Sequence, residues 1–206
     1  HHDHAEKHGH DEHGHDEHAH DDEHGHEDAH DHEGADPHAW LEPANARTWL
    51  RAIATALGAA DPDNAAVYSA NAEAASARIA TLEATLKARL SSAATRPIVV
   101  FHDAYGYFED AFGITVAGTI AEGDAAAPGA QRLVELRQTI EQVGVVCLFR
   151  EPQHSPALAE RVAEETGAAL GTLDPLGALV EPGPMFYDRV MTALADNILT
   201  CLDQGA

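Results

Sequence analysis

The sequence predicts an α/β fold in which a four-stranded parallel sheet carries helices on both faces and follows a long helix. After residue 96, short apolar runs alternate with helical patterns, which is typical of a parallel sheet covered on both sides. Before that point, apolar residues recur at helical spacing over 67–90. Residues 1–35 hold almost no apolar side chains, so we expect a disordered tail there.

Two helices are expected before the sheet. The first runs from Pro43 or Ala44 to Leu57 and ends at Gly58. The second begins at Asp61, which can cap it, and Pro62 suits the first helical position. Its apolar positions are Val67, Ala70, Ala74, Ile79, Leu82, Leu86 and Leu90. At 1.5 Å per residue this helix would reach roughly 40 Å, so we expect it to connect two lobes.

The sheet region is predicted from four strand–helix repeats. The expected strands are 97–101, 114–118, 145–149 and 168–173, and the expected helices are 105–112, 128–143, 156–167 and 185–202. Each strand is short and apolar, as in Ile98 to Val100, and Gly167 ends the third of these helices. In such sheets ligands bind beyond the carboxyl ends of the strands.

The N-terminal tail is predicted to bind metal. Thirteen of the sixteen histidines lie in the first 32 residues among Asp and Glu, with Lys7 as the only basic residue. The candidate weak ligands are His8, His10, His13, His15, His18, His20, His24, His26, His30 and His32. Imidazole favours zinc, copper and nickel, and acidification should release the ions because protonated imidazole cannot ligate. An affinity tag would be an uninterrupted histidine run, and a merely solvating tail would not need histidine.

The net charge of −23 at pH 7 constrains the partners. A surface this acidic repels nucleic acid and anionic membranes and attracts cations. No apolar run approaches the roughly 18 residues of a membrane span. The chain opens inside the histidine tract without Met, so we expect it to continue a longer protein, and a missing signal peptide says nothing about secretion.

Three residues form a candidate zinc shell. His102 and Asp174 each directly follow a predicted strand, and His38 precedes the first helix beside Pro37 and near Trp40, which can pack against it. Two imidazoles and one carboxylate make most of a tetrahedral zinc site. Taken singly, His102 also fits a hydrogen-bonded core histidine and Asp174 a turn residue. His154 is interpreted as a surface loop residue.

Four motifs resemble those of the zinc-specific solute-binding proteins of ABC transporters, the ZnuA family. They are DPHAW at 36–40, FHDAYGYF at 101–108, EPQ at 151–153 and GTLDPLG at 171–177. The resemblance implies that His38 and His102 are zinc ligands and that Asp174 closes the site. It also implies a further histidine from an N-terminal lobe that this chain lacks, so the cleft here would be half-built.

The resemblance also bears on the two cysteines. Cys147 lies in the third predicted strand and Cys201 in the last helix, so a bond would tie that helix to the sheet. The alternative is that the two cysteines are separate buried thiols. Proteins of this family carry such a pair at these places, which favours a disulfide. A disulfide requires an oxidising compartment, here the periplasm.

The resemblance implies high-affinity Zn²⁺ binding and delivery to the membrane permease of an ABC transporter by a monomer that catalyses no reaction. It also implies the segments, namely a histidine-rich loop at 1–35, the end of the N-terminal lobe at 36–60, an inter-lobe connector helix at 61–95 and a C-terminal α/β lobe at 96–206. A metal-buffering or metallochaperone protein is an alternative. A zinc hydrolase is a weaker one, because the sequence has no HExxH motif and no evident general base beside His102.

Overall fold

The structure of this chain is a computed structural model that describes residues 36–121 and 128–205. The chain divides into two units, His1–Gly34 and Ala35–Ala206. The predicted disorder and metal binding of the tail therefore concern residues outside the described ones. The helices, strands and candidate site of the described residues lie in the second unit.

Four parallel strands form the sheet, as the sequence predicts. In chain order they are β1 (Ile98–Val100), β2 (Val116–Thr119), β3 (Cys147–Arg150) and β4 (Ala169–Thr172). Their order across the sheet is β2-β1-β3-β4, and every neighbouring pair is parallel. Strand β2 begins at Val116, two residues after the predicted start at Ile114. Ile114 itself is buried in the core ahead of the strand and is not paired in the sheet.

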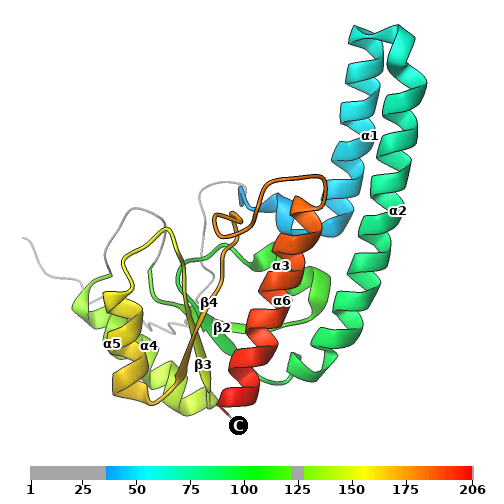
Figure 1. The fold of residues 1–206 in the computed structure, drawn as a ribbon. Coiled ribbons are helices and arrows are strands. Elements are labelled where there is room, and N and C mark those ends of the chain that lie inside the picture. The colour runs from blue at the N-terminus through cyan, green and yellow to red at the C-terminus, as the bar shows by residue number, and fades with distance from the viewer. Residues whose placement is uncertain (1–35, 122–127, 206) are drawn as a thin grey trace, which may run out of the picture. The chain divides into compact units, whose positions relative to one another are not determined.

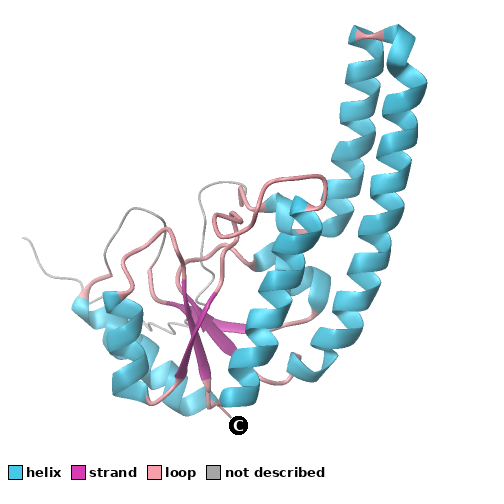
Figure 2. Ribbon diagram, in the orientation of Figure 1, coloured by secondary structure: helices cyan, strands magenta, loops and turns pink. Residues whose placement is uncertain are grey.

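Helices cover both faces of this sheet (Figures 1 and 2), which confirms the predicted fold class. They are α3 (Gly106–Phe112), α4 (Ala130–Val143), α5 (Ala157–Thr166) and α6 (Phe186–Gln204). Side chains alternate between the faces along each strand. Val99 and Leu148 pack with α4 and α5, whereas Ile98, Val100 and Phe149 pack with α3 and α6.

Before the sheet, two helices form an antiparallel hairpin. They are α1 (Pro43–Ala60) and α2 (Ala65–Leu90), joined through Asp61 and a short 3-10 turn. The first helix continues past Gly58, which was expected to end it. A Cβ at Gly58 would lie 3.1 Å from that of Ala65, so glycine here allows the two helices to approach closely. Asp61 does not cap through its side chain, which instead accepts hydrogen bonds from Asn64 and Tyr68.

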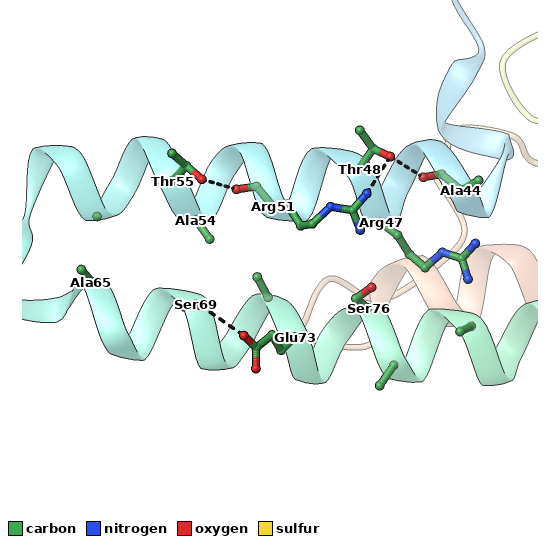
Figure 3. A pocket seen from close by; sticks show the side chains of 14 residues that line it. Ala44, Arg47, Thr48, Arg51, Ala54, Thr55, Ala65, Ser69, Glu73 and Ser76 are labelled. Carbon is green, nitrogen blue, oxygen red and sulfur yellow. Dashed lines mark hydrogen bonds between the residues drawn. The ribbon is translucent and has the colours of Figure 1, made fainter.

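The large apolar side chains of α2 are buried only in its C-terminal half. Ile79, Leu86 and Leu90 are buried, whereas Val67 near the start of the helix is 54% exposed. A groove runs between α1 and α2 along the hairpin, lined largely by short side chains such as Ala54 and Ser76 (Figure 3). These residues cannot build a core of their own, because alanine and serine bury little apolar area.

Two connections hold the last helix in place. Arg78 of α2 forms an ion pair with the largely buried Asp188 of α6 at 2.9 Å. A disulfide joins Cys147 of β3 to Cys201 of α6, as the resemblance implied. Within the described ranges, the chain has no helix with both the length and the apolarity needed to cross a bilayer.

Candidate metal site

His38 is held in one orientation by its neighbours. It is 9% exposed and lies immediately before the short 3-10 helix Ala39–Leu41. Its backbone N–H and its ring Nδ1 both contact Oδ1 of Asp36, at 2.9 and 2.8 Å. The ring of Trp40 packs edge-on against it, with centroids 5.3 Å apart, as predicted. With Nδ1 engaged by a carboxylate, Nε2 is the ligand atom that His38 presents.

The segment around His38 is fixed to the sheet region through Trp40. The Trp40 indole N–H donates to the backbone carbonyl of Pro175 at 3.0 Å. The Tyr187 hydroxyl of α6 donates to the Trp40 carbonyl at 3.1 Å. These two bonds join residues more than 130 positions apart in the sequence, so they bring His38 to the carboxyl end of the sheet.

His102 follows β1 and is oriented by a buried carboxylate. Its Nδ1 lies 2.7 Å from Oε2 of Glu151, which follows β3 directly. Glu151 is 2% exposed, and its Oε1 accepts a hydrogen bond from the Tyr105 hydroxyl at 3.0 Å. Burial, and then the negative charge of Glu151, raise the pKa of Tyr105 well above its ordinary value. The hydroxyl therefore stays protonated and keeps donating to Glu151.

The two imidazoles face each other. The ring centroids of His38 and His102 are 5.3 Å apart with an interplanar angle of 65°. Two imidazoles bound to one tetrahedral zinc, with Zn–N bonds of about 2.0–2.1 Å, have centroids roughly 5 Å apart. In both rings a carboxylate engages Nδ1, the arrangement that orients Nε2 toward a metal in many zinc proteins.

The two rings share a cavity of about 250 Å³. Its lining residues are His38, His102, Glu151, Gln153, His154, Pro175 and Leu176. This lining combines three imidazoles with one carboxylate and two apolar side chains. Imidazole and carboxylate are zinc ligands, and the apolar residues limit access of water.

The third predicted ligand, Asp174, does not line this cavity. It is 9% exposed, and it borders a neighbouring pocket of about 400 Å³ together with Glu151 and His154. Its Oδ1 accepts from Gln153 at 2.8 Å, and its Oδ2 accepts from the backbone N–H of Leu179 at 2.7 Å. Asp174 thus stabilises its own turn and holds Gln153, which does line the cavity.

Two cavity residues were missed by sequence reasoning. Glu151 directly follows β3, but the strand was predicted to end at Phe149, so the rule that selected His102 and Asp174 passed over it by one residue. His154 was expected on the surface, yet its side chain is only 17% exposed and its ring stacks on Phe101 with centroids 4.4 Å apart. The residue does lie in a loop, as expected, but its side chain is partly buried. Phe101 is 53 positions away, so no sequence signal pointed to this contact.

The sequence matches the family described as ZnuA, zinc-uptake complex component A, periplasmic, over residues 1–201. The chain belongs to the ZnuA family. Relatives with the name high-affinity zinc uptake system protein ZnuA include one from Paracoccus denitrificans, 44% identical over 165 residues, and one from Brucella suis, 40% identical over 165 residues. A crystal structure of ZnuA is 32% identical with a TM-score of 0.72.

These relatives are longer than this chain. The Paracoccus match covers 80% of this chain and 51% of the relative, and the Brucella match covers 80% and 49%. The ZnuA crystal structure matches over 81% of this chain and 60% of its own. The chain therefore spans about half the length of the ZnuA family relatives that it matches. The fold and the family follow from these matches.

Proposed function

We propose that this chain captures Zn²⁺ with high affinity in the periplasm and delivers it, as a monomer and without catalysing a reaction, to the permease of an ABC transporter. The observation that carries the proposal is the pair of buried imidazoles, His38 and His102, whose centroids are 5.3 Å apart. Membership in a family described as a zinc-uptake component supports the same conclusion.

The ligand chemistry favours zinc, copper and nickel over magnesium, calcium and manganese. Neutral imidazole suits the first three ions, whereas the other three prefer oxygen ligands. In the proposal, Nε2 of His38 and Nε2 of His102 bind the ion, and the carboxylates of Asp36 and Glu151 hold the two rings.

Asp174 is proposed as the carboxylate that completes the shell. Its Oδ1 is bound to the Gln153 amide, so ligation requires this hydrogen bond to be exchanged for the ion. A carboxylate oxygen has two lone pairs, and Oδ2 can keep its bond from the Leu179 N–H during the exchange. Zinc binding would then rearrange the hydrogen bonds of the turn after β4.

The histidine-rich tail is proposed to collect zinc at lower affinity. Its histidines alternate with acids and small residues, which favours many equivalent partial sites over one closed shell. The long helix α2 is proposed as the connector between lobes, for which its 26 residues are sufficient in length.

Zinc competition against a chelating dye tests the proposal on the full chain. His38→Gln and His102→Gln are each expected to weaken the tight site by more than about 100-fold, because each removes an ion ligand. Asp174→Asn should weaken it less, and Asp63→Asn, which removes an exposed acid from the hairpin, serves as the matched control.

A second arm replaces the thirteen tail histidines with glutamine. Loss of the weak sites alone, with the tight site intact, is the expected result. If His38→Gln and His102→Gln retain tight binding while the tail variant loses it, the chain acts through its tail as a metal buffer, and the cavity is not the zinc site.

A further inference from the structure

A second group of possible ligands lies next to the first and shares one of its residues. His102, Glu151 and His154 each offer a ligand atom, and these atoms all lie within 4.8 Å of one another. Oε2 of Glu151 lies 2.7 Å from Nδ1 of His102 and 3.7 Å from Nε2 of His154. The side chain of Glu151 is fully buried.

The position of His154 is fixed by stacking. Its ring lies on that of Phe101 with an interplanar angle of 17°, and its centroid is 5.6 Å from that of His102. The turn that carries it is closed by a hydrogen bond from the His154 N–H to the Glu151 carbonyl at 3.2 Å. Glu151 and His154 therefore come from one turn, and His102 meets them from another strand.

We infer that His102, Glu151 and His154 form an accessory zinc position beside the one between His38 and His102. Two imidazoles and a carboxylate are ligands that zinc accepts. Ligands of one zinc with bonds of about 2.0–2.2 Å stand roughly 3.3 Å apart. The 3.7 Å separation is close to this, and the 2.7 Å contact must lengthen slightly as an ion enters. This inference rests on the proposed function, which assigns the neighbouring position between His38 and His102 to zinc.

The shared histidine makes the two positions alternatives. A neutral imidazole has one N–H and one lone pair, so it can ligate through only one nitrogen. Zinc between His38 and His102 takes Nε2 and leaves the proton on Nδ1, which lies 2.7 Å from Oε2 of Glu151. Zinc at the accessory position takes Nδ1, and the proton moves to Nε2. The ion can thus pass between the positions while His102 changes tautomer, and the number of protons on the protein stays the same.

Three variants of the full chain isolate the accessory position. In a background with the tail histidines replaced by glutamine, His38→Gln removes a ligand of the first position only. This variant is expected to keep measurable, weaker zinc binding. Adding His154→Phe, which keeps an aromatic ring on Phe101, should weaken the remaining binding by at least about tenfold. Adding Glu151→Gln instead should weaken it similarly, whereas adding Glu164→Gln, an exposed acid on α5, is the control.

The readouts are chelator competition with Zn²⁺ and X-ray absorption of the bound zinc. We expect the His38→Gln variant to show two imidazoles on the ion and its His154→Phe derivative to show one, with one zinc per chain throughout. Equal affinity of these two variants, or two zinc ions bound in the cavity at once, overturns the inference. Equal affinity of the parent and His38→Gln overturns the proposed function instead, so the two failures are distinguishable. Circular dichroism confirms that each variant is folded.

Discussion

The α1–α2 hairpin and the sheet region bury their apolar residues to very different extents. The strands and the helices beside them bury Val99, Leu148 and Phe149 completely. In the hairpin, Trp49, Ile53 and Leu57 recur every four residues along α1 and remain 43–54% exposed. The sheet region therefore supplies most of the stability of the described chain, whereas the outer hairpin contributes little core.

The candidate site takes one imidazole from each region. His38 stands at the base of the hairpin, and its carboxylate partner, Asp36, is two residues away and partly exposed. His102 stands at the sheet, and its partner, Glu151, is fully buried and comes from another strand. His102 is thus positioned by the core, and His38 by a local segment that Trp40 connects to the sheet region.

The largest expected effect concerns the disulfide of the sheet region. Replacing Cys147 and Cys201 with alanine should lower the free energy of unfolding by up to about 4 kcal/mol, because the bond closes a loop with a sequence separation of 54 residues. Urea denaturation of the oxidised protein and the double variant measures this. Reduction of the wild-type protein should cause a similar loss, and an unchanged unfolding midpoint would show that the sheet does not depend on the bond.

A matched pair of leucines compares the part of the hairpin that packs into the core of the sheet region with the outer part that does not. Leu86 on α2 packs into the core and is 1% exposed, whereas Leu57 on α1 is 43% exposed. Leu86→Ala should cost about 3 kcal/mol through lost burial and the cavity that remains. Leu57→Ala should change stability by about 0.5 kcal/mol or less. Similar losses for both, measured by thermal and urea unfolding, would contradict the view that stability comes from the core around the sheet rather than from the outer hairpin.

These regions also differ in how far the sequence predicts them. The strands of the sheet are continuous apolar runs, and their predicted ends selected His102, which lines the cavity, and Asp174, which borders the neighbouring pocket. The hairpin was less predictable. Gly58 was expected to end the first helix but lies within it, where the missing Cβ leaves room for Ala65 of α2, a contact that the local sequence does not reveal. The apolar repeat of α2 likewise predicted one continuous buried face, whereas the large apolar side chains are buried only in the half near α6, and the other half faces the short side chains of α1.

The site shows the same limit. His154 lies in a turn that reads as exposed, and only the fold places its ring on Phe101. The pairing of Glu151 with His102 joins two strands that are adjacent in the sheet but 49 positions apart in the sequence. Spacing cannot reveal such a pair, whereas the Asp36–His38 contact is local enough for a motif to contain it.

A third prediction compares the two carboxylates that orient the rings. Glu151→Gln should weaken zinc binding by about 10–100-fold, because the buried carboxylate both fixes His102 and raises its basicity. Asp36→Asn should have a smaller effect, near the lower end of that range, because Asp36 is partly exposed and the amide oxygen can still accept from the His38 N–H. Zinc competition measures both. A larger loss for Asp36→Asn would mean that the local segment, rather than the core, determines the affinity.

The smallest expected effects are opposite pH dependences of stability in the two regions. Burial is the main cause that raises the pKa of Glu109, in the sheet region, above its ordinary value of 4.5. Hydrogen bonds from Asn64 and Tyr68 lower the pKa of Asp61, at the tip of the hairpin, below its ordinary value of 3.8. The folded state thus holds the Glu109 proton more tightly than the unfolded chain does, and the Asp61 proton less tightly.

The sign of each contribution follows from linkage. The stability that Glu109 contributes is present below pH 4.5 and is lost as the pH rises through its folded-state pKa. The contribution of Asp61 is present above pH 3.8 and is lost as the pH falls through its own lowered pKa. Glu109→Gln, whose amide oxygen can still accept from the Val116 N–H, should therefore flatten the decline in stability above pH 4.5. Asp61→Asn should flatten the decline on the acid side, as measured by urea unfolding between pH 3 and 7. If both variants changed the same side of the profile, the two regions would not differ in how they hold their carboxyl groups.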